Sequence, residues 1–243
     1  MLKKAILLSY DPRPPADVFV LSAIFLHGGM AMAVKGIDME RYARRGHFAY
    51  FCAMQYPYVG VTQETEVTDL LAACRERQRS FYLSFLHAAA LAADGVPQFR
   101  QRIRAGGIVE YSECPTSHIE LLEDETYCYC TLRHHMPLEE YYPYAEEARR
   151  QCRQRASIEE DAEVESLYFI STLPWLHYSA LIQPVAGGDE SNPRITWGQY
   201  RQDANGRVSL PVTVLAHHAL VDGIHIARFY QNLQEQLRML ARP

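Results

Sequence analysis

The chain has 243 residues, of which 48% are hydrophobic and 22% charged, and a net charge of −5. These values are typical of a globular protein long enough to bury one large core, which excludes a disordered or collagen-like chain. A net acidic chain repels a phosphate backbone, so nucleic-acid binding is not expected as its main task. Six cysteines spread over this length do not form a dense disulfide framework, and we expect them to be reduced and structural.

The first 31 residues differ in character from the rest of the chain. A short apolar run behind two lysines is interrupted by a proline-rich segment, and the second apolar run, 18–26, is only nine residues long. A membrane span needs roughly 20 apolar residues, and a signal sequence has its apolar part directly after its positive end. We therefore expect a cytoplasmic protein without a membrane segment, with residues 1–31 as an extension and residues 32–243 as one domain. A translation start at Met30 or Met32 is a hypothesis that the mass of the intact protein tests.

The middle of the chain predicts alternating strands and helices. Thr68 is expected to cap a helix that ends near residue 78. The apolar, alanine-rich segment 80–93 predicts a buried helix that stops at Asp94 and Gly95. Further strands are expected from Val59 onward, at 107–112 and at 118–122, and an exposed helix with early acids and late bases is expected at 139–155.

The last third predicts strands followed by one long helix. A strand is expected to end at Ser171, and segments 194–200 and 207–220 are joined through Asn-Gly at 205–206, a hairpin signal. Apolar residues at helical spacing predict an amphipathic helix from Asp222 onward. This mixture of helices and late antiparallel strands favours the α+β fold class, with helices packed on one face of a large sheet.

The segment around residue 218 contains the residues that point to chemistry. Because a strand alternates its side chains, His217 and His218 are expected to face opposite sides, with His218 at the end of an apolar strand. Asp222 and Gly223 follow where the last helix begins. Three interpretations compete: a core histidine, a metal site, and a catalytic histidine followed by a structural aspartate. The metal site is disfavoured because adjacent strand histidines point apart.

A second group of residues of metal-ligating types lies near the middle of the chain, at 128–135. Cys128 and Cys130 are followed by His134 and His135. Their spacing is not that of a zinc ribbon or finger. We therefore expect no metal site.

The heptapeptide HHALVDG at 217–223 resembles the HHxxxDG signature of CoA-dependent acyltransferases, and His218 keeps its H-x-x-x-D-G spacing. The signature also occurs in condensation domains, in plant acyltransferases and in the catalytic domain of dihydrolipoyl acyltransferases. Further segments are similar to those of the chloramphenicol acetyltransferase family, in its order and nearly at its spacing. They are RRGHFAYF at 44–51, VPQFRQRI at 96–103, ISTLPWLHY at 170–178 and RITWGQY at 194–200.

The resemblance implies a two-layer α/β sandwich with a large mixed sheet, assembled as a homotrimer with active sites between subunits. It also implies direct transfer of an acetyl group from acetyl-CoA to a small-molecule hydroxyl. In that reaction His218 would be the general base and Ser171 would donate a hydrogen bond to the oxyanion. Thr196 would steady a water beside the intermediate, and Asp222 and Arg44 would form an ion pair that holds the His218 loop.

The resemblance further places residues at the two substrates. Trp175, Tyr178 and Tyr200 stand where contacts with CoA are expected. Tyr50 and Phe51 match an aromatic pair beside the family's chloramphenicol pocket.

Three positions of the acceptor pocket depart from the family pattern. Leu181 and Gln183 stand where an aromatic and an aliphatic contact are usual, and His118 replaces a small hydroxyl residue. An acetyltransferase of the same fold with a different hydroxylated acceptor is therefore one alternative. A dihydrolipoyl acyltransferase-like core is another, weakened because no lipoyl-like domain precedes the fold. A third is an inactive binding module, against which the presence of all the catalytic residue types argues.

Overall fold

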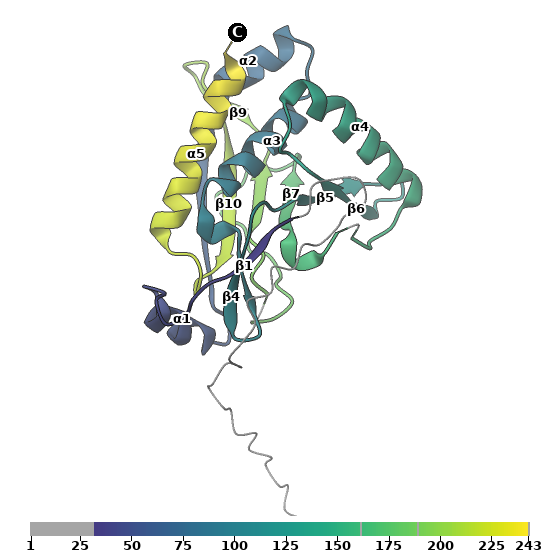
Figure 1. The fold of residues 1–243 in the computed structure, drawn as a ribbon. Helices are drawn as coiled ribbons and strands as arrows, with labels where there is room; N and C mark the ends of the chain where they lie inside the picture. The colour runs from purple at the N-terminus through teal and green to yellow at the C-terminus, as the bar shows by residue number, and fades with distance from the viewer. Residues whose placement is uncertain (1–31, 161, 189, 243) are drawn as a thin grey trace, which may run out of the picture.

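The computed structural model describes residues 32–160, 162–188 and 190–242. The expected N-terminal extension and the start at Met30 lie outside these residues, and Met32 is the first residue described. The expected α+β class is confirmed, because helices and a large mixed sheet form two layers (Figure 1). No described helix combines the length and apolar character needed to cross a membrane.

The large sheet contains seven strands in the order β2-β10-β8-β7-β5-β6, with β9 paired to β10. Strand β7 runs parallel to β5 and β8, and the other pairs are antiparallel. The strands are β2 (Tyr58–Glu66), β5 (Thr116–Leu121), β6 (Tyr127–Leu132), β7 (Tyr168–Leu173), β8 (Arg194–Gly198), β9 (Arg201–Gln202) and β10 (Val208–His217).

One face of this sheet is covered by helices, and a smaller three-stranded sheet lies at one end (Figure 1). The helices are α1 (Arg45–Cys52), α2 (Thr68–Glu76), α3 (Phe81–Asp94), α4 (Leu138–Arg155) and α5 (Gly223–Ala241), with short 3-10 turns at Pro97–Phe99 and Val164–Ser166. The small sheet has the order β1-β4-β3 and consists of β1 (Val34–Gly36), β3 (Gln101–Arg104) and β4 (Gly107–Tyr111).

Alternation along β10 gives the sheet one apolar and one hydroxyl-bearing face. Val212 and Val214 are fully buried, and Trp197, paired with Val212, packs its ring against Phe85 of α3 with centroids 4.8 Å apart. The residues between them point the other way. On that second face a row of hydroxyl side chains lies in register across four strands: Thr62, Thr213, Thr196 and Ser171.

The N-termini of α2 and α5 are formed differently. Thr68 is the first residue of α2 and not its cap, because its hydroxyl is engaged with Glu66 and the Val208 backbone. Asp222, which the sequence placed where the last helix begins, caps α5 in a reciprocal capping box with His225. The hairpin turn is also confirmed, since Gly206 has a φ of 83°, in the region that favours glycine. All six cysteines are free thiols.

Candidate active site

A single arginine holds the turn between β10 and α5. Arg44, at the N-terminus of α1, places its guanidinium 2.8 Å from the Asp222 carboxylate. The same guanidinium donates hydrogen bonds to the backbone carbonyls of His218, Ala219 and Leu220. The ion pair expected from the sequence is therefore present, and it is extended by contacts that fix the backbone of the turn itself.

The imidazole of His218 is held on one side only. Its Nδ1 lies 3.0 Å from the Val221 carbonyl and 3.1 Å from the Asp222 carboxylate. Both partners are acceptors, so Nδ1 carries the proton and Nε2 presents its lone pair. No hydrogen bond to Nε2 is found within the described ranges, and 29% of the side chain is exposed. This histidine can accept a proton from a group that approaches it.

Two aromatic residues of α1 lie beside this base. The ring of Phe51 stacks on the His218 imidazole, with centroids 3.8 Å apart and planes inclined by 14°. The Tyr50 ring meets Phe51 edge-on at 5.1 Å and is 63% exposed. The aromatic pair expected at the acceptor therefore adjoins the histidine.

The neighbouring histidine has a different environment. His217 is buried, and its Nε2 lies 2.8 Å from the Gly188 carbonyl while its Nδ1 accepts a hydrogen bond from the Ala219 amide. Both ring nitrogens are therefore occupied. His217 fastens the loop that contains Gly188 to the sheet, and neither nitrogen is free to act as a base.

A second group of candidate residues lies on the hydroxyl-bearing face of the sheet. Ser171 on β7 is paired in register with Thr196 on β8. No hydrogen bond engages the Ser171 hydroxyl in the described part of the chain. The Thr196 hydroxyl, by contrast, accepts a hydrogen bond of 2.8 Å from the Gln183 amide. The sequence marked Gln183 as a departure in the acceptor pocket but gave no sign of this contact.

A glycine on β8 allows the segment after β7 to pack against the strand. A Cβ built on Gly198 would lie 2.5 Å from the Leu176 carbonyl and 2.9 Å from the Tyr178 ring. This close approach brings the Tyr178 hydroxyl within 2.9 Å of the Thr196 carbonyl. The glycine is thus a requirement of the site, because any larger residue would push Tyr178 away from Thr196.

His218 and its neighbours do not meet the Ser171–Thr196 group within one chain. Ser171 pairs with Thr196, which pairs with Thr213, and Thr213 precedes His218 by five residues along β10. At about 3.3 Å per residue this is roughly 16 Å along the strand direction alone. A substrate atom at His218 is therefore out of reach of the Ser171 of the same chain.

The remaining predicted binding residues lie in the segments that follow β7 and β8. Trp175 is 64% exposed, Tyr178 and Leu181 are half-buried, and Tyr200 is exposed with its ring edge-on to Phe81. None of them contacts His218. Tyr178 lies beside Thr196 in the Ser171 group, whereas Tyr200 contacts α3 through Phe81.

His118 lies on the opposite face from Ser171. It pairs in register with Ile170, and its Nε2 lies 3.2 Å from Glu120 within a buried group that includes Arg149. Burial lowers the pKa of His118, against the opposing effect of Glu120. A polar residue at this position therefore belongs to the packing between sheet and helices, and the expectation that it alters the acceptor pocket is not supported.

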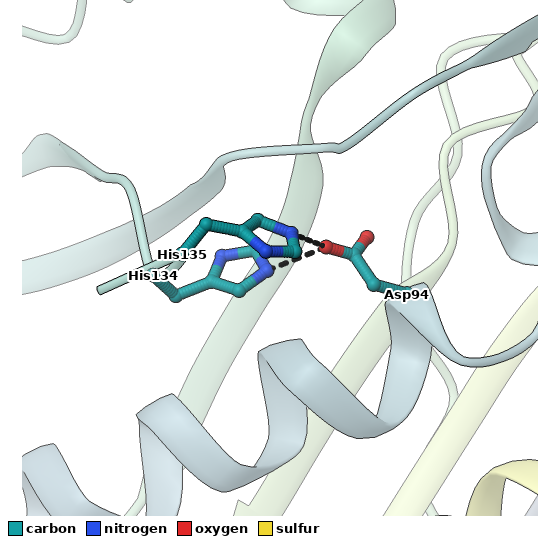
Figure 2. A group of neighbouring side chains, drawn as sticks. All are labelled: Asp94, His134 and His135. Carbon is teal, nitrogen blue, oxygen red and sulfur yellow. Dashed lines mark hydrogen bonds and ion pairs between the residues drawn. The ribbon is translucent and has the colours of Figure 1, made fainter. Parts of the chain in front are cut away.

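One cluster that sequence reasoning missed lies at the end of α3. Figure 2 shows His134 and His135 directing one ring nitrogen each toward a single oxygen of Asp94, at 2.7 and 2.6 Å. The Tyr168 hydroxyl donates to the other carboxylate oxygen at 2.7 Å. Burial raises the pKa of Asp94, but these hydrogen bonds outweigh it and hold the pKa well below its usual range.

The cluster fits a hydrogen-bonded carboxylate better than a metal site. A metal would require both Nε2 lone pairs and would move both ring protons to Nδ1. The Nδ1 of His134 is buried and has no partner, whereas a metal-bound histidine ordinarily donates this proton to an acceptor. The three ligand atoms lie within 4.8 Å of one another, but they contact each other as donors and acceptor. We propose no metal here.

Comparison with known proteins agrees with the fold and the motifs. The sequence model of the family described as chloramphenicol acetyltransferase matches residues 32–234. Chloramphenicol acetyltransferase 2 of Escherichia coli is 26% identical over 201 residues, which are 82% of this chain and 94% of that protein. Its namesake from Haemophilus influenzae is 27% identical over the same shares of both chains.

Solved structures give the same architecture. A chloramphenicol acetyltransferase superposes with a TM-score of 0.73 and 23% identity, over 84% of this chain and 99% of that one. A probable dihydrolipoamide acetyltransferase from Listeria monocytogenes gives a TM-score of 0.62 at 13% identity, over 84% and 93% of the two chains.

The two-layer fold and the family's sequence pattern define an acyltransferase. The chain belongs to the chloramphenicol acetyltransferase family. This family uses acetyl-CoA as its co-substrate and acts on small-molecule acceptors.

The Asp94 cluster predicts a pH-dependent loss of stability in Asp94→Asn. The hydrogen bond to Asp94 raises the pKa of His135. The His135–Asp94 pair therefore stabilises the fold fully below about pH 6.5, and this stabilisation is lost as the pH rises through the raised pKa of His135. The carboxylate itself stabilises the fold above about pH 3.9 and its effect is lost as the pH falls. The free energy of unfolding should therefore drop by roughly 2–4 kcal/mol, most strongly between these two pH values.

Urea denaturation of Asp94→Asn and the wild type from pH 3.5 to 8 measures this difference. The exposed Glu235 on α5 supplies the control, because Glu235→Gln should leave stability almost unchanged. A loss that is independent of pH would show that Asp94 acts through packing alone.

Proposed function

We propose that residues 32–243 form one acyltransferase domain that transfers the acetyl group of acetyl-CoA to the primary hydroxyl of chloramphenicol, as a homotrimer in the cytoplasm. The observation that carries this proposal is the orientation of His218. Its Nδ1 is bound to Val221 and Asp222, and its Nε2 is left as a free proton acceptor beside the half-buried Phe51 and the exposed Tyr50. The six free cysteines fit a reducing compartment.

In the proposed reaction, His218 Nε2 removes the proton of the acceptor hydroxyl as the oxygen attacks the thioester carbonyl. The tetrahedral oxyanion accepts a hydrogen bond from Ser171, and Thr196 steadies a water beside it. When the intermediate collapses, the carbon–sulfur bond breaks, and the imidazolium returns its proton to the CoA thiolate. Both substrates are held together, so the acetyl group passes directly between them.

Asp222 and Arg44 have a geometric role in this proposal. The guanidinium binds the Asp222 carboxylate and three carbonyls of the turn, so the ring orientation of His218 depends on it. The carboxylate also stabilises the imidazolium that forms during the reaction. Neither residue transfers a proton.

The proposed substrate contacts follow the two groups of residues. Tyr50 and Phe51 would pack against the nitrophenyl ring of the acceptor beside His218. Trp175, Tyr178 and Tyr200 would contact CoA on the side of Ser171, and Leu181 would line the acceptor pocket.

The separation of His218 from Ser171 supports an active site shared between subunits. One chain supplies the base and a second would supply the oxyanion donor. Large apolar side chains are exposed beside both groups, with Tyr50 at 63%, Trp175 at 64% and Ile182 at 94%. Exposed apolar surface of this kind is typical of a protein–protein contact. A homotrimer would bury it and complete three sites.

The acceptor pocket also favours a second candidate, an acetyltransferase of the same fold that acts on a different alcohol. Gln183 places a carboxamide on Thr196, where the family has an aliphatic contact. A polar group left without a partner costs about 1–3 kcal/mol. An alcohol that satisfies this carboxamide would then bind better than chloramphenicol.

Replacing the proposed base should abolish acetyl transfer without unfolding the protein. In His218→Ala the turnover number should fall by about 10²–10⁴, because no other group can take the proton. His217→Ala should retain far more activity and lose stability instead, since His217 holds Gly188 and not a substrate. Steady-state rates and thermal melts of both variants measure the contrast. Equal activity losses at the two positions would refute the assignment.

Release of CoA thiol with saturating chloramphenicol tests the acceptor. We expect turnover above background hydrolysis and a product acetylated on the primary hydroxyl. The KM for chloramphenicol should be roughly tenfold to a hundredfold higher than that of the Escherichia coli relative, because of the unsatisfied carboxamide. If chloramphenicol gives only the background rate while another alcohol is acetylated through His218, the acetyltransferase proposal stands with the second candidate acceptor.

A further inference from the structure

The hydroxyl of Thr196 has an unusual set of partners. Thr196 is buried, with 1% of its surface exposed, and its Oγ1 accepts the hydrogen bond from Gln183. Its backbone carbonyl accepts a second hydrogen bond from Tyr178. Across the described ranges, no acceptor is found for the hydroxyl's own hydrogen. A buried donor without an acceptor is costly, so an acceptor from outside this chain is expected.

The direction of the Gln183–Thr196 hydrogen bond is set by what each orientation leaves unpaired. With the amide nitrogen toward Thr196, the buried Gln183 Oε1 remains without a partner. With the amide reversed, Oε1 would accept a hydrogen bond from the Thr196 hydroxyl, and the NH₂ group would be buried in place of that oxygen with both hydrogens unpaired. Unpaired buried donors are less well tolerated than unpaired carbonyl oxygens. The structure has the first orientation, with Gln183 as the donor and Thr196 as the acceptor.

This direction determines what Thr196 can do. A hydroxyl has one hydrogen, and since the bond to Gln183 occupies a lone pair, that hydrogen stays available. Thr196 also faces the same side of the sheet as Ser171, its neighbour in register. The free hydrogen of Thr196 and the free hydroxyl of Ser171 thus lie side by side.

We propose that Gln183 is a positioning residue that fixes the Thr196 hydroxyl as a hydrogen-bond donor toward the reaction centre. This inference rests on the proposed function, in which the oxyanion and its water lie beside Ser171. The acceptor of the Thr196 hydrogen is then an oxygen of the water or of the reacting acetyl group. In this role Gln183 acts through Thr196 and does not contact the reacting atoms. An aliphatic residue at position 183 would leave the hydroxyl free to rotate.

The variant Gln183→Glu tests the direction of the bond. Its carboxylate can only accept, so it would turn the Thr196 hydrogen away from the reaction centre. We expect the kcat of Gln183→Glu to fall by about tenfold or more, with the KM for acetyl-CoA unchanged. This kcat should agree with that of Thr196→Val to within about threefold. Combining both substitutions should give no further loss, because each removes the same donor.

The pH profile of Gln183→Glu provides a readout that a merely structural role would not move. When the pH falls and the new carboxylate is protonated, it can donate to Thr196 again, so the kcat of the variant relative to the wild type should recover. Gln202→Glu is the matched control, because Gln202 makes a comparable hydrogen bond to the Gly206 carbonyl in the exposed turn after β9. Its kcat should equal that of the wild type at every pH.

The outcomes separate this inference from the proposed function. If Thr196→Val lowers kcat and Gln183→Glu does not, the inference is overturned and the function stands. If neither variant changes kcat while the wild type is active, Thr196 does not contribute to the reaction, and the inference about Gln183 is overturned. If the wild type acetylates no alcohol, the proposed function fails and the inference with it.

Discussion

The hydrogen bonds of the Arg44 guanidinium are the interaction on which the candidate base depends. They connect the start of α1 to the turn between β10 and α5, through the Asp222 carboxylate and the carbonyls of residues 218–220. Asp222 in turn caps α5 and contacts His218 Nδ1. The same helix α1 stacks Phe51 on the imidazole. The position, tautomer and surroundings of His218 therefore follow from one partly buried network.

The large sheet imposes a second constraint. Its helix-covered face is packed mainly with apolar side chains, and the polar group of His118 and Glu120 on that face is buried, whereas the row of hydroxyl side chains lies on the other face. Ser171 and Thr196 lie on that face near the middle of their strands, whereas His218 lies beyond the end of β10. No single chain can close this distance without breaking the register. The proposed homotrimer resolves it by pairing the base of one subunit with the hydroxyls of the next.

The sequence predicted the features that depend on local patterns. The HHxxxDG spacing, the start of the last helix at Asp222 and the Gly206 hairpin could be predicted, because each needs only a few neighbouring residues. Contacts between distant segments were not. Asp94 meets His134 across 40 residues, and no periodicity signals such a pair. The direction of the Gln183–Thr196 hydrogen bond likewise depends on which amide atom would be buried unpaired.

The shared active site is most directly tested by mixing inactive subunits. Ser171→Ala and His218→Ala protomers, each inactive alone, would be co-expressed at equal levels and the mixed trimers purified through two different tags. Each site that joins an intact Ser171 to an intact His218 from the other protomer should work. In every mixed trimer, one of the three interfaces has this arrangement, so about a third of wild-type activity is predicted. Mixed oligomers with no more activity than the two separate variants would contradict a site built from two subunits.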